Sequence, residues 1–99
     1  MAEVIWTYPT IDDLNGIAEY IALSNITAAK NLTLKIFDKT SRLEGHLASG
    51  KRPIELSNLK YREVVVNPCR IFYKVDSDKV YILHIMRQER ELRRFLLQS

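Results

Sequence analysis

The chain has 99 residues, 46% hydrophobic and 27% charged, and a formal net charge of +3. These values are typical of one soluble globular domain, so we expect a single domain over residues 1–99. No apolar run approaches the roughly 20 residues that a membrane helix needs, and the first residues lack a basic, apolar leader. With one cysteine, Cys69, the composition predicts a cytoplasmic protein without disulfides and without membrane contact.

The charge is unevenly distributed along the chain. Residues 1–50 contain four basic and six acidic residues, whereas residues 51–99 contain eleven basic and six acidic ones. An asymmetry of this kind favours an anionic partner, which could be nucleic acid, an acidic protein or an acidic peptide.

The beginning of the chain predicts a strand followed by a helix. Glu3–Thr7 is apolar and ends before Pro9, which cannot donate to a strand ladder. Thr10 has the character of a helix N-cap, and Asp13, three residues later, completes a variant of the capping box. The apolar residues then recur at helical spacing: Ile11, Leu14, Ile17, Ala18 and Ile21.

A second helix follows after a very short link. Thr27 is its expected N-cap, and the apolar spacing continues to about His46 or Ala48. Because the link is short, the two helices should form an antiparallel hairpin. The Gly, Ser and Pro residues of 48–53 predict a loop.

Residues 61–87 predict a three-stranded antiparallel meander. Runs of Val, Ile, Tyr and Phe are separated by turn residues at 67–68 and 76–78. With a period of two, the middle strand has one face with Ile71, Tyr73 and Val75 and another with Arg70, Phe72 and Lys74. On the last strand Val80, Ile82, His84 and Met86 alternate with Tyr81, Leu83, Ile85 and Arg87. Both of its faces are apolar, so this strand should be central.

The helical hairpin can cover only one face of such a sheet. Glu89–Leu97 has apolar residues at helical spacing among arginines, and predicts a short basic amphipathic helix, or a tail that becomes one on binding. This segment or a partner should cover the second face. The fold class is therefore α+β, with an N-terminal strand, an antiparallel two-helix hairpin, a three-stranded antiparallel meander and a short C-terminal helix.

The residue pattern favours neither a metal site nor a cofactor. His46 and His84 are far apart and have no Cys or carboxylate at ligand spacing. Cys69 has no neighbouring histidine and suits a small buried position. The three glycines are isolated, so no phosphate-binding loop is expected. We therefore predict no metal, no cofactor and no catalytic residue.

Basic residues are the remaining candidates for a binding site. Two interpretations are open: an ordinary solvated face with weak surface pairs, or a surface that meets carboxylates or phosphates. Arg62 and Arg70 lie in strands that should be neighbours, and we expect them to project from one sheet face into a groove. The candidate residues for binding a partner or a target are Arg62, Arg70, Phe72, Arg87, Arg90, Arg93 and Arg94.

The order of elements, together with Y-R-E-V-V-V-N-P-C-R-I-F-Y-K-V-D-S-D-K-V-Y-I-L-H-I-M-R, resembles the RelE/ParE superfamily of bacterial toxins from type II toxin–antitoxin systems. The opening W-T-Y-P-T-I-D-D-L-N-G-I-A-E-Y-I resembles the start of that family, and the likeness covers nearly the whole chain. The segment R-E-V-V-V-N-P before R-I-F-Y-K-V is more similar to the ParE branch than to the RelE branch.

The two branches imply different functions. RelE-type toxins cleave mRNA on the ribosome with a basic sheet groove, a strand arginine and commonly a C-terminal Tyr or His, whereas ParE-type toxins poison DNA gyrase. By resemblance, Arg70 matches the strand arginine and Arg62 a further basic position of the nuclease branch. The chain departs from that branch at Val64 and Gln88, where basic residues are expected, and at Arg94, where a tyrosine is expected.

General acid–base cleavage of RNA needs a group that accepts a proton, and arginine stays protonated. The resemblance therefore favours a gyrase inhibitor, without enzymatic activity, whose contact with gyrase is led by Arg90, Arg93 and Arg94. A RelE-type ribonuclease with Arg62, Arg70 and Arg87 on phosphate is the alternative, and a non-toxic binding or co-repressor module is a third.

The resemblance also implies a cognate antitoxin. It would cover the sheet groove and the C-terminal region, and it would supply the main contact with DNA.

Overall fold

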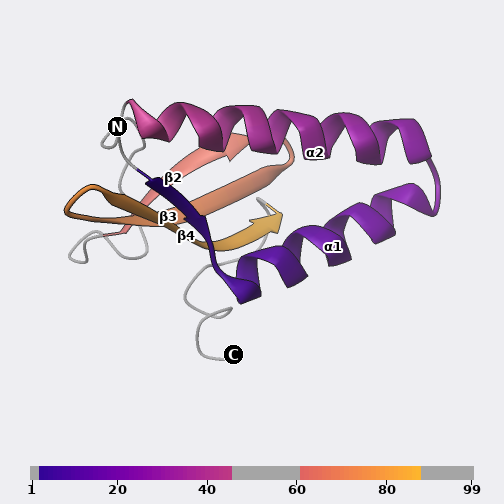
Figure 1. Cartoon of the computed structure of the whole chain (residues 1–99). Coiled ribbons are helices and arrows are strands. Elements are labelled where there is room, and N and C mark those ends of the chain that lie inside the picture. The colour runs from indigo at the N-terminus through magenta and orange to yellow at the C-terminus, as the bar shows by residue number, and fades with distance from the viewer. Residues whose placement is uncertain (1–2, 46–60, 88–99) are drawn as a thin grey trace.

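The computed structural model describes residues 3–45 and 61–87 of the chain. Their order is strand, two helices, a 3-10 turn and three strands, which confirms the predicted α+β class (Figure 1). The elements are β1 (Glu3–Trp6), α1 (Tyr8–Ala22), α2 (Ile26–Ser41), η1 (Arg42–Glu44), β2 (Tyr61–Val66), β3 (Cys69–Asp76) and β4 (Lys79–Arg87). The loop expected at 48–53 and the C-terminal helix expected at Glu89–Leu97 lie outside the described residues.

The four strands form one sheet in the order β1-β4-β3-β2. Strands β2, β3 and β4 make the predicted antiparallel meander, and β1 adds to β4 in parallel, with Val4 opposite Val80 and Trp6 opposite Ile82. Strand β4 is therefore central, as its two apolar faces predicted.

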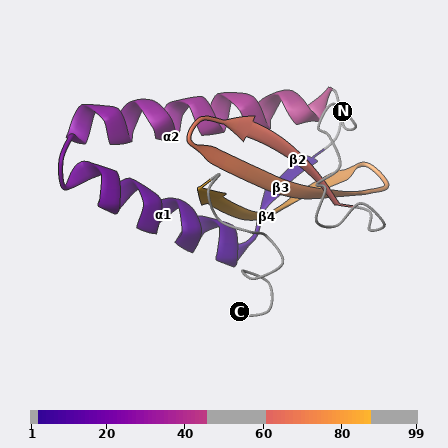
Figure 2. The ribbon, with the colours of Figure 1, turned by 180° about the vertical axis from the view of Figure 1, so that it is seen from behind.

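The antiparallel helices α1 and α2 cover one face of the sheet (Figure 1). Seen from behind, the sheet lies in front of the helices (Figure 2). Leu14 of α1 and Ile36 of α2 belong to the buried core that packs on Ile71 of β3 and Ile82 of β4. The tip of the hairpin extends beyond the sheet (Figure 1), and Leu23 there is 86% exposed.

A β-bulge changes the predicted faces of β4. Phe72 pairs with His84, but the next residue, Tyr73, pairs with Ile82, so Leu83 is the extra residue of β4. Strict alternation is therefore wrong beyond Ile82. Ile85, instead of His84, continues the helix-covered face and is fully buried in the core.

The helix starts also differ from the predicted ones. Thr7, instead of Thr10, is the N-cap residue of α1, and Pro9 lies in its first turn, where a missing amide proton does no harm. Asn25, instead of Thr27, caps α2, because its side-chain oxygen accepts the Ala28 amide proton at 2.9 Å. The α-helix ends at Ser41, earlier than predicted, and continues as η1.

Candidate functional site

Three polar side chains of the first turns of α1 line the edge of β4 where β1 ends. They recur every third residue, so they share one face of the helix. The Thr7 and Thr10 hydroxyls donate to the Ile82 carbonyl oxygen at 2.7 and 2.6 Å, and the Asp13 carboxylate accepts the Ile85 amide proton at 3.1 Å. This threonine–aspartate seam gives β4 the hydrogen bonds that a longer β1 would have supplied. The Asp13 side chain therefore forms a hydrogen bond with the sheet, and it is not the capping-box residue that we predicted.

The same carboxylate contacts His84, which follows the bulge residue Leu83 in β4. His84 Nδ1 lies 3.3 Å from Asp13 Oδ2, and their side chains are 19% and 18% exposed. Burial raises the pKa of the Asp13 carboxyl above its ordinary value, although hydrogen bonds from Ile85 and His84 oppose the rise. A carboxylate beside an imidazole can fix the orientation of the ring. No local sequence pattern indicates this contact, because 71 residues separate the partners.

Arg70 is paired inside the protein, on the sheet face away from the helices. Its Nε donates to Glu63 Oε2 at 2.7 Å, and the two side chains are 13% and 5% exposed. The Arg70 guanidinium also lies 4.8 Å from the centre of the Phe72 ring, which is itself buried. The positive charge that we expected in a binding groove is thus paired with Glu63, which is not among the predicted binding residues.

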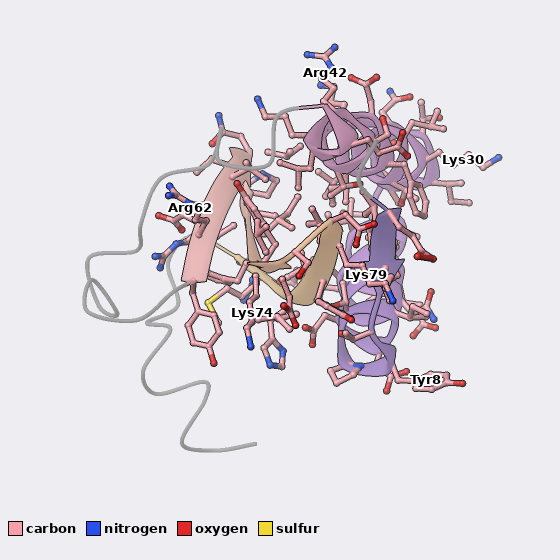
Figure 3. The ribbon with its side chains drawn as sticks, turned by 60° about the vertical axis from the view of Figure 1, so that its left-hand side comes forward. Tyr8, Lys30, Arg42, Arg62, Lys74 and Lys79 are labelled. Atoms are coloured by element: carbon pink, nitrogen blue, oxygen red, sulfur yellow. The ribbon has the colours of Figure 1, made fainter. Side chains whose placement is uncertain are left out.

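Arg62 and Arg70 do not project from one sheet face. Arg62 lies opposite Tyr73, a core residue of the helix-covered face, whereas Arg70 lies opposite Val65 on the other face. Paired residues of antiparallel strands share a face, so the expected common groove of the two arginines is wrong. Figure 3 shows Arg62 beside edge strand β2.

Arg87 lies at the end of β4, where its guanidinium is 5.1 Å from the centre of the Tyr20 ring of α1. Next to it is a depression of about 320 Å³, which we call the α1–β4 pocket. Its lining residues are Asp12, Asp13, Gly16, Ile17, Tyr20, Ile85, Met86 and Arg87. Of the predicted binding residues, Arg87 therefore lines a cavity, whereas Arg90, Arg93 and Arg94 lie outside the described residues.

A second, more open depression of about 510 Å³ lies between α1 and α2 on the outer side of the hairpin. Its floor is formed by small side chains such as Ala18, Ala22 and Ala29, with Glu19 and Lys30 among its lining residues. Lys30 extends from α2 away from the sheet (Figure 3). This hairpin groove is almost entirely apolar, so it is a surface suited to an apolar partner.

Within residues 3–45 and 61–87, no three His, Cys, Asp or Glu side chains are grouped so that they could hold a metal ion. Cys69 is buried in β3, as its residue type suggested. No helix in this part of the chain is long and apolar enough to cross a membrane.

Comparison with known proteins gives three consistent matches. The family model described as ParE toxin of type II toxin–antitoxin system, parDE, matches residues 4–92. Toxin RelE2 of Caulobacter vibrioides is 32% identical over 91 residues, which cover 91% of this chain and 99% of that protein. A solved structure described as the chromosomal ParDE TA system from P. aeruginosa has a TM-score of 0.75 at 24% identity, and covers 90% of this chain and 98% of that one. At this identity the structural match shows a common fold.

Proposed function

Since the chain belongs to the ParE toxin family of type II toxin–antitoxin systems, we propose that it inhibits DNA gyrase and that its cognate antitoxin prevents this inhibition. The family itself implies the antitoxin partner. The toxin would act in the cytoplasm as a single domain over residues 1–99, and the antitoxin would make the main contact with DNA.

The Glu63–Arg70 pair is the observation that supports gyrase inhibition over RNA cleavage. A ribonuclease of the RelE type would need Arg70 to meet a phosphate. With Glu63 Oε2 at 2.7 Å from Arg70 Nε, a phosphate would first have to displace a buried carboxylate. Such a displacement would break a buried ion pair, which is strongly unfavourable.

Contact with gyrase is then a protein–protein interaction, for which arginine is well suited because it is enriched at interfaces and forms bidentate contacts with carboxylates. Arg87 lies at the end of the described part of β4. In this proposal Arg87 is the first of the arginines that contact gyrase, and Arg90, Arg93 and Arg94 follow it in the sequence.

The test combines two assays on the purified toxin, free of antitoxin. We expect it to inhibit supercoiling by gyrase and to leave mRNA intact on programmed ribosomes. Replacing Arg90, Arg93 and Arg94 together with alanine should abolish the inhibition. The matched control removes three exposed positive charges elsewhere, at Lys35, Lys39 and Arg42, and should inhibit like the wild type. Equal inhibition by both triple variants would refute the role of the C-terminal arginines.

One observation favours the second candidate, a ribosome-dependent ribonuclease. His84, held by Asp13, lies opposite Phe72 and so shares a sheet face with Arg70, and a histidine can accept a proton where arginine cannot. A similar protein is named Toxin RelE2. If mRNA is cut while supercoiling stays normal, and His84→Gln abolishes the cleavage, this second function replaces the first.

A further inference from the structure

We propose that the α1–β4 pocket receives one lysine or arginine side chain of the cognate antitoxin. The inference rests on the antitoxin that the family implies, and it does not require gyrase to be the target. Three properties of the pocket carry it: its apolar floor, its single uncommitted carboxylate and its position beside Arg87.

The floor of the pocket suits the alkyl stem of a long side chain. Ile17, Ile85 and Met86 supply apolar surface. The space beside Gly16 is open, because a Cβ built on this residue would meet no atom within 4 Å. A pocket of about 320 Å³ is large enough for one such side chain.

The charged side chains around the pocket differ in the contacts that they already make within the protein. The Asp13 carboxylate accepts the Ile85 amide proton and contacts His84, and the Arg87 guanidinium lies over the Tyr20 ring. Asp12 is exposed, and no residue of the described part of the chain forms a hydrogen bond or ion pair with it. The group that remains to be paired is therefore a carboxylate, and its complement is a cation.

An apolar floor with a carboxylate at the rim matches lysine and arginine, whose alkyl stems pack on apolar surface while the charged head stays near water. An acidic side chain would instead meet two carboxylates, Asp12 and Asp13, against one guanidinium.

The position of the pocket favours the antitoxin as the source of this side chain. Arg87 is both a wall of the pocket and the first of the arginines that we assign to the target. An antitoxin anchored there would lie directly over Arg87. Neutralisation would then follow from steric exclusion, without any change in the fold of the toxin.

Gly16 offers a test with a matched control. Gly16→Leu fills the pocket, whereas Gly16→Ala leaves most of it open. Both variants replace a glycine inside α1 by a strong helix former, so they should fold equally well. We expect Gly16→Leu to weaken binding of the purified cognate antitoxin about tenfold or more, as loss of a buried anchor does. Gly16→Ala should bind like the wild type, and both variants should keep their activity on the target.

A substitution at Asp12 tests the charge of the antitoxin side chain. Asp12→Lys should also weaken antitoxin binding, and replacement of one antitoxin lysine or arginine by glutamate should restore it. Antitoxin affinity that is unchanged in Gly16→Leu, or no restoration by any such replacement, would overturn the proposal. Loss of gyrase inhibition in Gly16→Leu would assign the pocket to the target instead. A wild-type toxin that does not inhibit gyrase would refute the proposed target alone, because the antitoxin affinities would still be measured.

Discussion

Removing the carboxylate of Glu63 should destabilise the fold severely. In Glu63→Ala the guanidinium of Arg70, only 13% exposed, loses the carboxylate oxygen that lies 2.7 Å from its Nε. Breaking a buried ion pair by removal of one partner costs about 3–5 kcal/mol. Domains of this size are stable by only about 5–15 kcal/mol, so a large part of the stability would be lost.

The chain contains an internal control for this magnitude. Asp38 and Arg42 form an ion pair of similar length, 3.0 Å, but their side chains are 64% and 67% exposed on the surface. An exposed pair of this spacing on a helix contributes about 0.3–0.5 kcal/mol. Asp38→Ala should therefore lower the free energy of unfolding several times less than Glu63→Ala, although both substitutions remove one carboxylate and one ion pair.

Urea unfolding followed by circular dichroism measures both effects. The double variant Glu63→Met with Arg70→Met removes both charges at similar volume, and it should recover most of the lost stability. It should also keep its toxicity if Arg70 is a structural residue. If Glu63→Ala and Asp38→Ala cost the same, the internal pairing of Arg70 is refuted. If the double variant is stable but harmless, Arg70 acts on the target.

The remaining predictions concern α1 and α2. Because burial raises the pKa of Asp13 above its ordinary value of 3.8, the folded protein binds this proton more tightly than the unfolded chain, and stability should fall as the pH rises from below 3.8 through the raised pKa. Asp13→Asn should flatten that part of a stability–pH curve, whereas Asp12→Asn should keep it; identical curves for the two variants would contradict the assignment. Asn25→Ala should lower the free energy of unfolding by about 1 kcal/mol through loss of the N-cap, and Thr27→Ala should change it little. The opposite order in urea unfolding would restore Thr27 as the cap.

The architecture was accessible from sequence because apolar periodicity is a strong signal. The two-sided apolar pattern of the last strand led directly to its central position in the sheet. The register was not accessible in the same way. A single bulge at Leu83 exchanges the faces of all later residues, and no local pattern shows where an extra residue lies.

The candidate site was harder to predict because its contacts are long-range. Arg70 was singled out as an arginine within a strand, but its partner could be named only with the register of β2 and β3, which brings Glu63 next to it. An acidic residue within an apolar strand was a usable signal, because a buried carboxylate needs a partner. The contact of Asp13 with His84 required the packing of α1 against β4. Thr10 and Thr27 had the right residue type for N-caps, yet tertiary contacts and a neighbouring asparagine decided otherwise.

The position of β4 has a consequence for synthesis of the toxin. The first described strand, β1, pairs with the last one, β4, and β4 lies between β1 and β3. The sheet therefore cannot assemble until residues 79–87 have been synthesised. Most of the chain must therefore leave the ribosome before Val4 and Trp6 find their partners, because contacts between segments distant in sequence form late. Nascent chains that end before β4 would lack the core of the fold, and a truncated product would be harmless to the cell that makes it.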